Sequence, residues 1–210
     1  MKLKYYGHAC FTLRFADGTV LAIDPFDESV TYASCDESCD AALLSHDHFD
    51  HNHVQTLRGD FVTIREAGSY DVRGVRVTAV PSFHDKQRGA LRGHNLIFRI
   101  EGEGLTIVHL GDLGHMPDDK QLRAISGADV LLTPIGGTYT IDTPEAEELI
   151  RLAQPKHAVA MHFRTPDYDF NTSTCEDFER DMRAVRMPRE IEITPENLVS
   201  LPEFLLMRYK

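Results

Sequence analysis

Long apolar runs, cysteine and positive charge are all scarce in this sequence. No window approaches the roughly 18 consecutive apolar residues that a membrane-spanning helix requires, which argues against a membrane-embedded protein. Four cysteines in 210 residues are too few and too scattered for a disulfide framework, and we interpret all four as thiols. Because the first residues also lack the apolar region of a signal peptide, the sequence predicts a cytoplasmic location.

The shortage of positive charge helps to distinguish a nucleic-acid partner from a small-molecule substrate. Lysine and arginine number 22 against 33 aspartates and glutamates, so the formal net charge is −11 and the general field repels nucleic-acid phosphates. Bound divalent cations would reverse that sign locally, which leaves nuclease chemistry open. The balance favours a small-molecule substrate over a nucleic acid, and it leaves a homo-oligomer open.

Length and pattern indicate one domain over residues 1–210. We expect helices at 118–125, 144–153 and 176–185, with Thr143 as a helix N-cap and Ser173 in a capping box, and a helical segment at 52–57. Strands are expected at 2–6, 10–15, 20–23, 41–45, 61–64, 68–72, 75–80, 94–100, 105–110, 130–133, 157–161, 190–193, 198–201 and 204–207. This order predicts a layered α/β fold, with two sheets packed face to face between helical layers.

Histidine is unusually frequent for its type, with 11 residues in 210, and its densest cluster follows the apolar run 41–45. His46 and His48 are two residues apart, so in an extended segment both imidazoles point to one side. Asp50 and His51 follow at once. Imidazole and carboxylate suit zinc, and also manganese or iron. Solvated turn residues are the alternative, but H-x-H-x-D-H is denser in ligands than a turn requires, and it predicts a metal site.

Three later residues share one position relative to the expected strands. His84, Asp112 and His162 each stand just past the end of an apolar β run. Taken alone, each is explained as well by a hydrogen-bonded histidine or a turn aspartate. Together with the H-x-H-x-D-H cluster, they are predicted to complete a metal site from distant parts of the chain.

In this order the motifs resemble those of the metallo-β-lactamase superfamily. The match begins at His46 and ends at His162, more than half of the chain. Four further segments are similar to the small branch of metal-dependent hydrolases that includes ascorbate-6-phosphate lactonase: Gly7–Phe11, Asp24–Phe26, Gly111–His115 and Pro134–Gly137. The resemblance implies a four-layer αββα sandwich with the metals at one edge of the two sheets.

The resemblance also implies two divalent metal ions, with zinc as the first expectation and manganese or iron(II) as alternatives. It assigns His46, His48 and His84 to the first metal, Asp50, His51 and His162 to the second, and Asp112 to a position between them. A hydroxide bridging the metals would attack a carbonyl or phosphorus centre. Asp50 and His115 are the catalytic candidates, with His115 as an acid or a substrate contact.

Several other residues allow two interpretations. Asp24 is a candidate partner for a ligating histidine, and His8 for the pocket floor, although both are also ordinary structural positions. Arg88, Arg92 and His94 form either a polar lip over the site or a solvated loop. Cys35 and Cys39 could form a redox pair or half of a metal site, but we interpret them as exposed thiols in a loop.

The function predicted from these residues is hydrolysis of a small, anionic ester, lactone or phosphoester. A metal-dependent phosphodiesterase or nuclease is the nearest alternative, because such enzymes use the same motif order. An iron enzyme that oxidises thiols or reduces oxygen and a non-catalytic metal-binding interaction domain are the others. Metal identity and turnover would discriminate among them.

Overall fold

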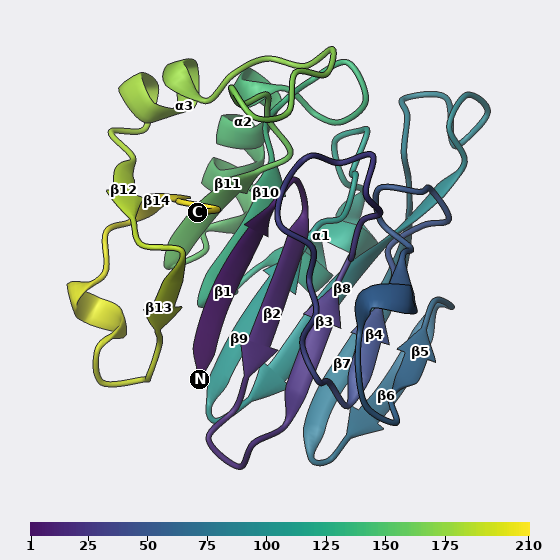
Figure 1. Cartoon of the computed structure of the whole chain (residues 1–210). Helices are drawn as coiled ribbons and strands as arrows, with labels where there is room; N and C mark the ends of the chain where they lie inside the picture. The colour runs from purple at the N-terminus through teal and green to yellow at the C-terminus, as the bar shows by residue number, and fades with distance from the viewer.

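Two β-sheets packed face to face form the body of the computed structural model, which describes all 210 residues (Figure 1). The first sheet has six strands in the order β13-β1-β2-β3-β4-β5. Their bounds are Lys2–Gly7 (β1), Cys10–Arg14 (β2), Val20–Ile23 (β3), Ala41–Leu43 (β4), Val62–Ile64 (β5) and Glu190–Glu192 (β13). This sheet contains the chain's N-terminal strands, which lie in front of the second sheet in Figure 1.

The second sheet has eight strands in the order β12-β14-β11-β10-β9-β8-β7-β6. Their bounds are Gly68–Val72 (β6), Val75–Phe83 (β7), His94–Gly102 (β8), Leu105–His109 (β9), Val130–Pro134 (β10), His157–Met161 (β11), Val185–Met187 (β12) and Phe204–Met207 (β14). The helices are α1 (Asp119–Ile125), α2 (Thr143–Ala153) and α3 (Glu176–Asp181), and two 3₁₀ turns cover Val54–Thr56 and Leu198–Ser200. None of these helices has the length and apolar character needed to cross a membrane.

The main core lies between the two sheets. It contains 30 buried residues, with Phe11 and Leu21 from the first sheet facing Val77 and Phe98 from the second. A second cluster lies between the eight-stranded sheet and helices α1, α2 and α3. Apolar side chains on alternating strand positions therefore fill both faces of the eight-stranded sheet, as a buried sheet requires.

The outer face of the six-stranded sheet is covered differently. A cluster of 12 buried residues lies there, and much of it comes from the loop 24–40, including Phe26 and Tyr32. The predicted two-sheet sandwich is confirmed, but loops and a 3₁₀ turn replace the outer helical layer expected on this side. Cys35 and Cys39 belong to this loop layer and are 0% and 6% exposed, so their interpretation as exposed thiols was wrong. All four cysteines are unpaired, as predicted.

Many helix and strand bounds differ from the prediction by one to three residues, strand β12 was not predicted, and three further differences stand out. Asp142, and not Thr143, caps α2, because its carboxylate accepts from the Glu145 backbone at 3.0 Å in a complete capping box. Helix α3 ends at Asp181, and Cys175 stands at its start without a side-chain cap. The expected strand at 198–201 is a 3₁₀ turn.

Strand direction explains where the polar residues gather. In the six-stranded sheet β1 and β3 are both antiparallel to β2, and β4 is parallel to β3. In the eight-stranded sheet β7 and β9 are both antiparallel to β8, and β10 and β11 continue parallel to β9. Strands β1, β3 and β4 thus run in one direction within their sheet, and β7, β9 and β11 do so in theirs. Their carboxyl ends bring the following loops to a common edge.

Candidate metal centre

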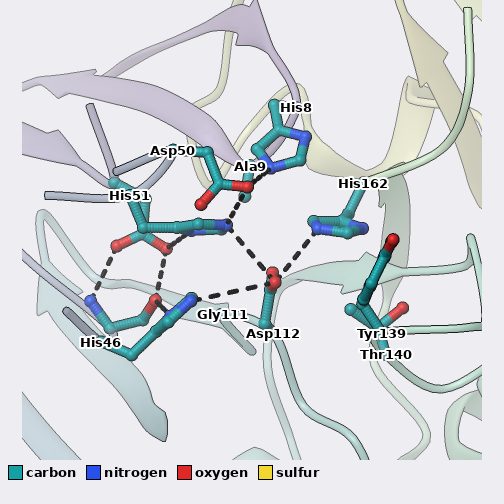
Figure 2. A network of polar contacts seen from close by, with 12 residues as sticks. His8, Ala9, His46, Asp50, His51, Gly111, Asp112, Tyr139, Thr140 and His162 are labelled. Carbon is teal, nitrogen blue, oxygen red and sulfur yellow. Dashed lines mark hydrogen bonds and ion pairs between the residues drawn. The ribbon is translucent and has the colours of Figure 1, made fainter. Parts of the chain in front are cut away.

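The residues predicted as ligands meet at this common edge. His8 follows β1, the segment His46–His51 follows β4, and His84, Asp112 and His162 follow β7, β9 and β11. Because each side chain lies in a loop within eight residues of the end of a buried strand, the sheets position the loop and the loop directs the side chain inward. Residues more than 150 positions apart in the sequence thereby share one site (Figure 2).

Strained backbone accompanies this convergence. His8, Asp24 and His162 have φ angles of 56°, 46° and 53°, in the left-handed region that costs a non-glycine residue about 1–3 kcal/mol. Gly111 also has a positive φ, and a Cβ there would lie 2.6 Å from Cβ of Ser45. A Cβ at Gly114 would lie 2.3 Å from the carbonyl carbon of His84. The two glycines flanking Asp112 are therefore needed for the close approach of these loops.

Asp112 occupies the centre of the group. Its Oδ2 lies 3.0 Å from Nε2 of His162, 3.2 Å from Nε2 of His84 and 3.4 Å from Nε2 of His51. Nε2 of His46 is 4.0 Å away. Figure 2 shows the carboxylate pointing between His46, His51 and His162. One carboxylate oxygen thus faces four imidazoles, and the Asp112 side chain is 3% exposed.

The histidines divide into two groups around Asp112, which we call the outer and inner trios. The outer trio is His46, His48 and His84, and the inner trio is His8, His51 and His162; within each, one ligand atom per residue lies within 4.8 Å of the others. All members of the inner trio are buried, whereas His46 and His48 are partly exposed. His46, His51 and Asp112 form a third such group, which joins the two trios.

Hydrogen bonds fix the ring orientations. Asp24 accepts from Nδ1 of His51 at 3.0 Å, as predicted for a partner of a ligating histidine, and this leaves Nε2 of His51 toward Asp112. The hydroxyl of Ser45 donates to Asp24 at 2.6 Å and lies 2.9 Å from Nδ1 of His46. In the outer trio, Nδ1 of His84 lies 3.0 Å from the backbone carbonyl oxygen of Tyr139.

His8 belongs to the site more directly than its predicted place on the pocket floor suggests. Its Nε2 lies 3.1 Å from Oδ2 of Asp50, and its ring centroid lies 4.2 Å from that of His162. Asp50 is at the margin of the group, because the same oxygen is 4.0 Å from Nε2 of His51. His8 thus ties the Asp50 carboxylate to the inner trio.

Burial and neighbouring charges shift the pKa values of these groups in different directions. Burial, reinforced by neighbouring imidazoles, lowers the pKa of His46 well below its ordinary value and lowers the pKa of His8 to about 4. Burial alone would raise the pKa of Asp50, but His51 and His8 lower it well below the ordinary range. The pKa of His51 is raised in spite of burial, because Asp112 and Asp50 are close. His46 and His8 are therefore neutral imidazoles, the form that binds metals.

Several buried polar atoms of the site have no hydrogen-bond partner. They are Nδ1 of His8, Nε2 of His46, Nε2 of His51, Oδ1 of Asp112 and Nδ1 of His162. Native structures leave only a few such atoms per hundred residues, so five in one place call for an explanation. Imidazole nitrogens and carboxylate oxygens are the donor set that zinc, manganese and iron accept. The residues present therefore fit divalent metal ions.

A cavity of about 360 Å³ opens onto this centre. His48, Asp50, His84, Asp112 and His162 all contribute to its wall. A larger cavity, about 740 Å³, lies elsewhere, between α3 and the C-terminal residues, and no histidine lines it. His46 and His48 also line a neighbouring cavity of about 450 Å³, whereas Asp112 and His162 line the cavity of about 360 Å³.

The structure does not bring His115 to this cavity. Its Nε2 accepts from the backbone N–H of Phe83 at 3.2 Å, and its Nδ1 lies 2.8 Å from the carbonyl oxygen of Met116. It lines a separate pocket with Asp118 and Gln121. Both ring nitrogens are occupied by backbone groups, which leaves no free nitrogen for the acid or substrate contact predicted from its place after Asp112.

Sequence reasoning missed several residues that build the site. Asn95 is fully buried and accepts from the backbone N–H of Asp112 at 2.9 Å. The rings of Tyr139, Tyr168 and Phe170 line the cavity. For Tyr168 and Phe170, the only signal in the sequence is that two aromatic residues follow His162. The role of the Tyr139 carbonyl has no signal in the sequence, since every residue has a carbonyl group.

Comparisons with known proteins agree with this architecture. A family model described as a beta-lactamase superfamily domain matches residues 2–162. A UPF0173 metal-dependent hydrolase from Thermoplasma acidophilum is 30% identical over 193 residues, which cover 80% of this chain and 85% of the relative. A UPF0173 metal-dependent hydrolase from Pyrobaculum arsenaticum is 28% identical and covers 96% of this chain and 100% of the relative.

A solved structure gives the same result in three dimensions. A Thermotoga maritima protein, assigned as a zinc-dependent hydrolase of the metallo-beta-lactamase superfamily, superposes with a TM-score of 0.82 at 34% sequence identity. The superposition covers 98% of this chain and 97% of that protein. An isothiocyanate hydrolase from gut bacteria of Delia radicum shares the fold at 17% identity, with a TM-score of 0.68.

Proposed function

This chain belongs to the beta-lactamase superfamily as a metal-dependent hydrolase, and from that membership we propose that it uses two metal ions to hydrolyse a small ester, lactone or phosphoester. The observation that carries the proposal is the placement of the Asp112 carboxylate. One of its oxygens faces imidazoles of both trios, and the other is buried without a partner. A carboxylate so placed is suited to bind two cations at once.

The proposed ligands are the outer trio and, with Asp50 in place of His8, the inner trio. His46, His48 and His84 hold one metal, and Asp50, His51 and His162 hold the other, with Asp112 between them. Zinc is the first candidate, and manganese and iron(II) suit the same donors. When bound, such a pair supplies Lewis acidity that lowers the pKa of water and polarises the bond to be cleaved. His8 is left as a positioning residue, because its Nε2 is directed at Asp50.

The residues of the chain prepare the site for this chemistry. Asp24 and the Tyr139 carbonyl hold His51 and His84 in fixed orientations, so little reorganisation accompanies metal binding. Asp50 remains ionised at neutral pH, since its pKa is lowered by His51 and His8 against the effect of burial. A carboxylate in this state, lining the cavity, is placed to accept a proton from water and return it to the leaving group.

A cytoplasmic location is part of the proposal. All four cysteines are free and buried, and free thiols are typical of proteins in a reducing compartment. The sequence resemblance to the branch that includes ascorbate-6-phosphate lactonase keeps lactones among the substrates to be tested.

The test combines elemental analysis of the purified protein with a panel of phosphodiester, phosphomonoester, ester and lactone substrates. We expect about two divalent metals per chain, and turnover that a chelator abolishes and added metal restores. His48→Ala should lose metal and turnover together, while Asn52→Ala, a control at a partly exposed residue whose amide donates to Asp47, should lose neither. Full metal content and full turnover in His48→Ala would contradict the proposal.

A further inference from the structure

Arg92 is a half-buried arginine in the wall of the cavity at the metal centre. Its guanidinium lies over the ring of Tyr139, 5.3 Å from the centroid, and has neither an acidic partner nor a hydrogen bond. Arg186, in the larger cavity near the C-terminus, is instead held by Glu179 with Nε 2.8 Å from Oε1. Arg92 therefore keeps all five N–H donors available to a ligand.

The backbone of Arg92 is fixed by the loop that follows the metal centre. The buried carboxylate of Asp85 accepts four backbone N–H bonds, from Gln87 at 2.7 Å, Gly89 at 3.0 Å, Leu91 at 3.0 Å and Arg92 at 2.8 Å. These bonds occupy both oxygens of the carboxylate, and no ion pair joins it to the guanidinium. A cation on a loop anchored in this way is held in place before a ligand arrives.

Tyr139 connects Arg92 to the metal centre. Its ring carries the guanidinium, and its backbone carbonyl lies 3.0 Å from Nδ1 of His84. The free cation and one histidine of the outer trio thus share a single supporting residue. Any group bound by Arg92 is consequently held in a fixed relation to the proposed reaction centre.

Aromatic rings make up much of the remaining cavity wall. Tyr168 and Phe170 are stacked with centroids 4.6 Å apart, and Tyr139 is nearly parallel to Phe170 at 6.5 Å. Phe49 lines the same cavity and is 55% exposed, which is unusual for so large an apolar side chain. Such a wall is suited to a flat, apolar part of a ligand.

We propose that Arg92 recognises an oxyanion, either a carboxylate or a phosphate, on a small substrate whose flat apolar part contacts Phe49, Tyr168 and Phe170. This inference rests on the proposed hydrolase function and specifies its substrate class. It also resolves the two interpretations that the sequence left open for the segment 88–94, because Arg92 lines the cavity and Arg88 does not. Arg92 is then a specificity-determining residue, separate from the groups that hold metal.

Binding of three non-hydrolysable probes to the zinc-loaded protein tests the proposal. Phenylphosphonate and benzoate carry an oxyanion on a phenyl ring, and benzamide is their neutral counterpart. Isothermal titration calorimetry would compare wild type with Arg92→Gln, Arg92→Lys and the control Arg88→Gln, which removes the same charge from an exposed position of the same loop. Zinc content and melting temperature of each variant show that the centre and the fold are intact.

We expect Arg92→Gln to weaken phenylphosphonate or benzoate binding about tenfold, Arg92→Lys to restore part of the loss, and Arg88→Gln to change it less than about twofold. Benzamide binding should be equal in all variants, and the oxyanion with the larger loss identifies the substrate group. Equal anion binding by wild type and Arg92→Gln would overturn the proposal, as would an equal loss for benzamide. If wild type hydrolyses nothing in the substrate panel yet binds these anions through Arg92, the hydrolase proposal fails and the anion site stands.

Discussion

The inner and outer histidine trios have similar ligand types and different support. In the inner trio, His51 is held by the Asp24 carboxylate and His8 contacts Asp50. In the outer trio, His46 has the Ser45 hydroxyl. His84 has a backbone carbonyl, and His48 has no protein partner. Carboxylate partners raise the basicity of an imidazole more than neutral partners do. We therefore expect the site at the inner trio to bind its metal more tightly, and the outer trio, in which His48 is partly exposed, to exchange metal more readily.

The largest effect should come from the residue that the trios share. Asp112→Asn keeps the shape of the side chain and removes the charge between both trios, so both metals should bind more weakly by well over a hundredfold, beyond the usual effect of a supporting residue. Zinc titration against a chromophoric chelator measures both steps. Asp47→Asn, in the ligand-rich segment His46–His51 but with a side chain 73% exposed, is the control. One site of unchanged affinity in Asp112→Asn would show that Asp112 serves a single trio.

Asp24→Asn should lower metal affinity at one trio much more than at the other. The substitution removes the charge behind His51 while an amide oxygen can still accept a hydrogen bond, and we expect metal affinity at the inner trio to fall by about ten- to a hundredfold. The outer trio should lose much less, because only Ser45 connects it to Asp24. The same chelator titration, followed in two steps, resolves the sites. A greater loss at the outer trio would reverse the comparison.

The site residues that could be predicted from sequence are those that stand just after an apolar run with the pattern of a strand. His84, Asp112 and His162 each follow such a strand, and because β7, β9 and β11 run in one direction their ends had to meet at one edge. The same reasoning predicted two packed sheets. The order of these residues along the chain is also what carries the resemblance to the metallo-β-lactamase superfamily.

The parts that could not be predicted depend on three-dimensional proximity. Asn95 supports Asp112 from a neighbouring strand, and Tyr139 supports His84 through a carbonyl group that every residue has. His115 stands near Asp112 in sequence, but its ring nitrogens are taken by backbone groups. The loop layer over the six-stranded sheet was also missed, because apolar residues such as Phe26 have no regular period there.

His8→Gln tests whether His8 binds metal or only positions Asp50. If His8 positions Asp50 through the 3.1 Å contact, metal affinity of the inner trio should fall only about tenfold, since the ligands themselves remain. His162→Ala, which removes a proposed ligand from the same trio, is the matched comparison and should lose far more. Zinc affinities of the two variants decide the matter. Equal losses would make His8 a ligand and not a positioning residue.

Ser45→Ala tests the neutral hydrogen bond between the Ser45 hydroxyl and His46 of the outer trio. The Ser45 hydroxyl donates to Asp24, so it accepts from Nδ1–H of His46, which leaves Nε2 of His46 toward Asp112. A neutral hydrogen bond contributes about 1 kcal/mol, so zinc affinity of the outer trio should fall about three- to fivefold. Alanine fits the space, because Cβ of Ser45 is already present beside Gly111. A loss as large as that of Asp24→Asn would mean that a hydroxyl supports its histidine as strongly as a carboxylate does, and the proposed difference in affinity between the trios would have no basis.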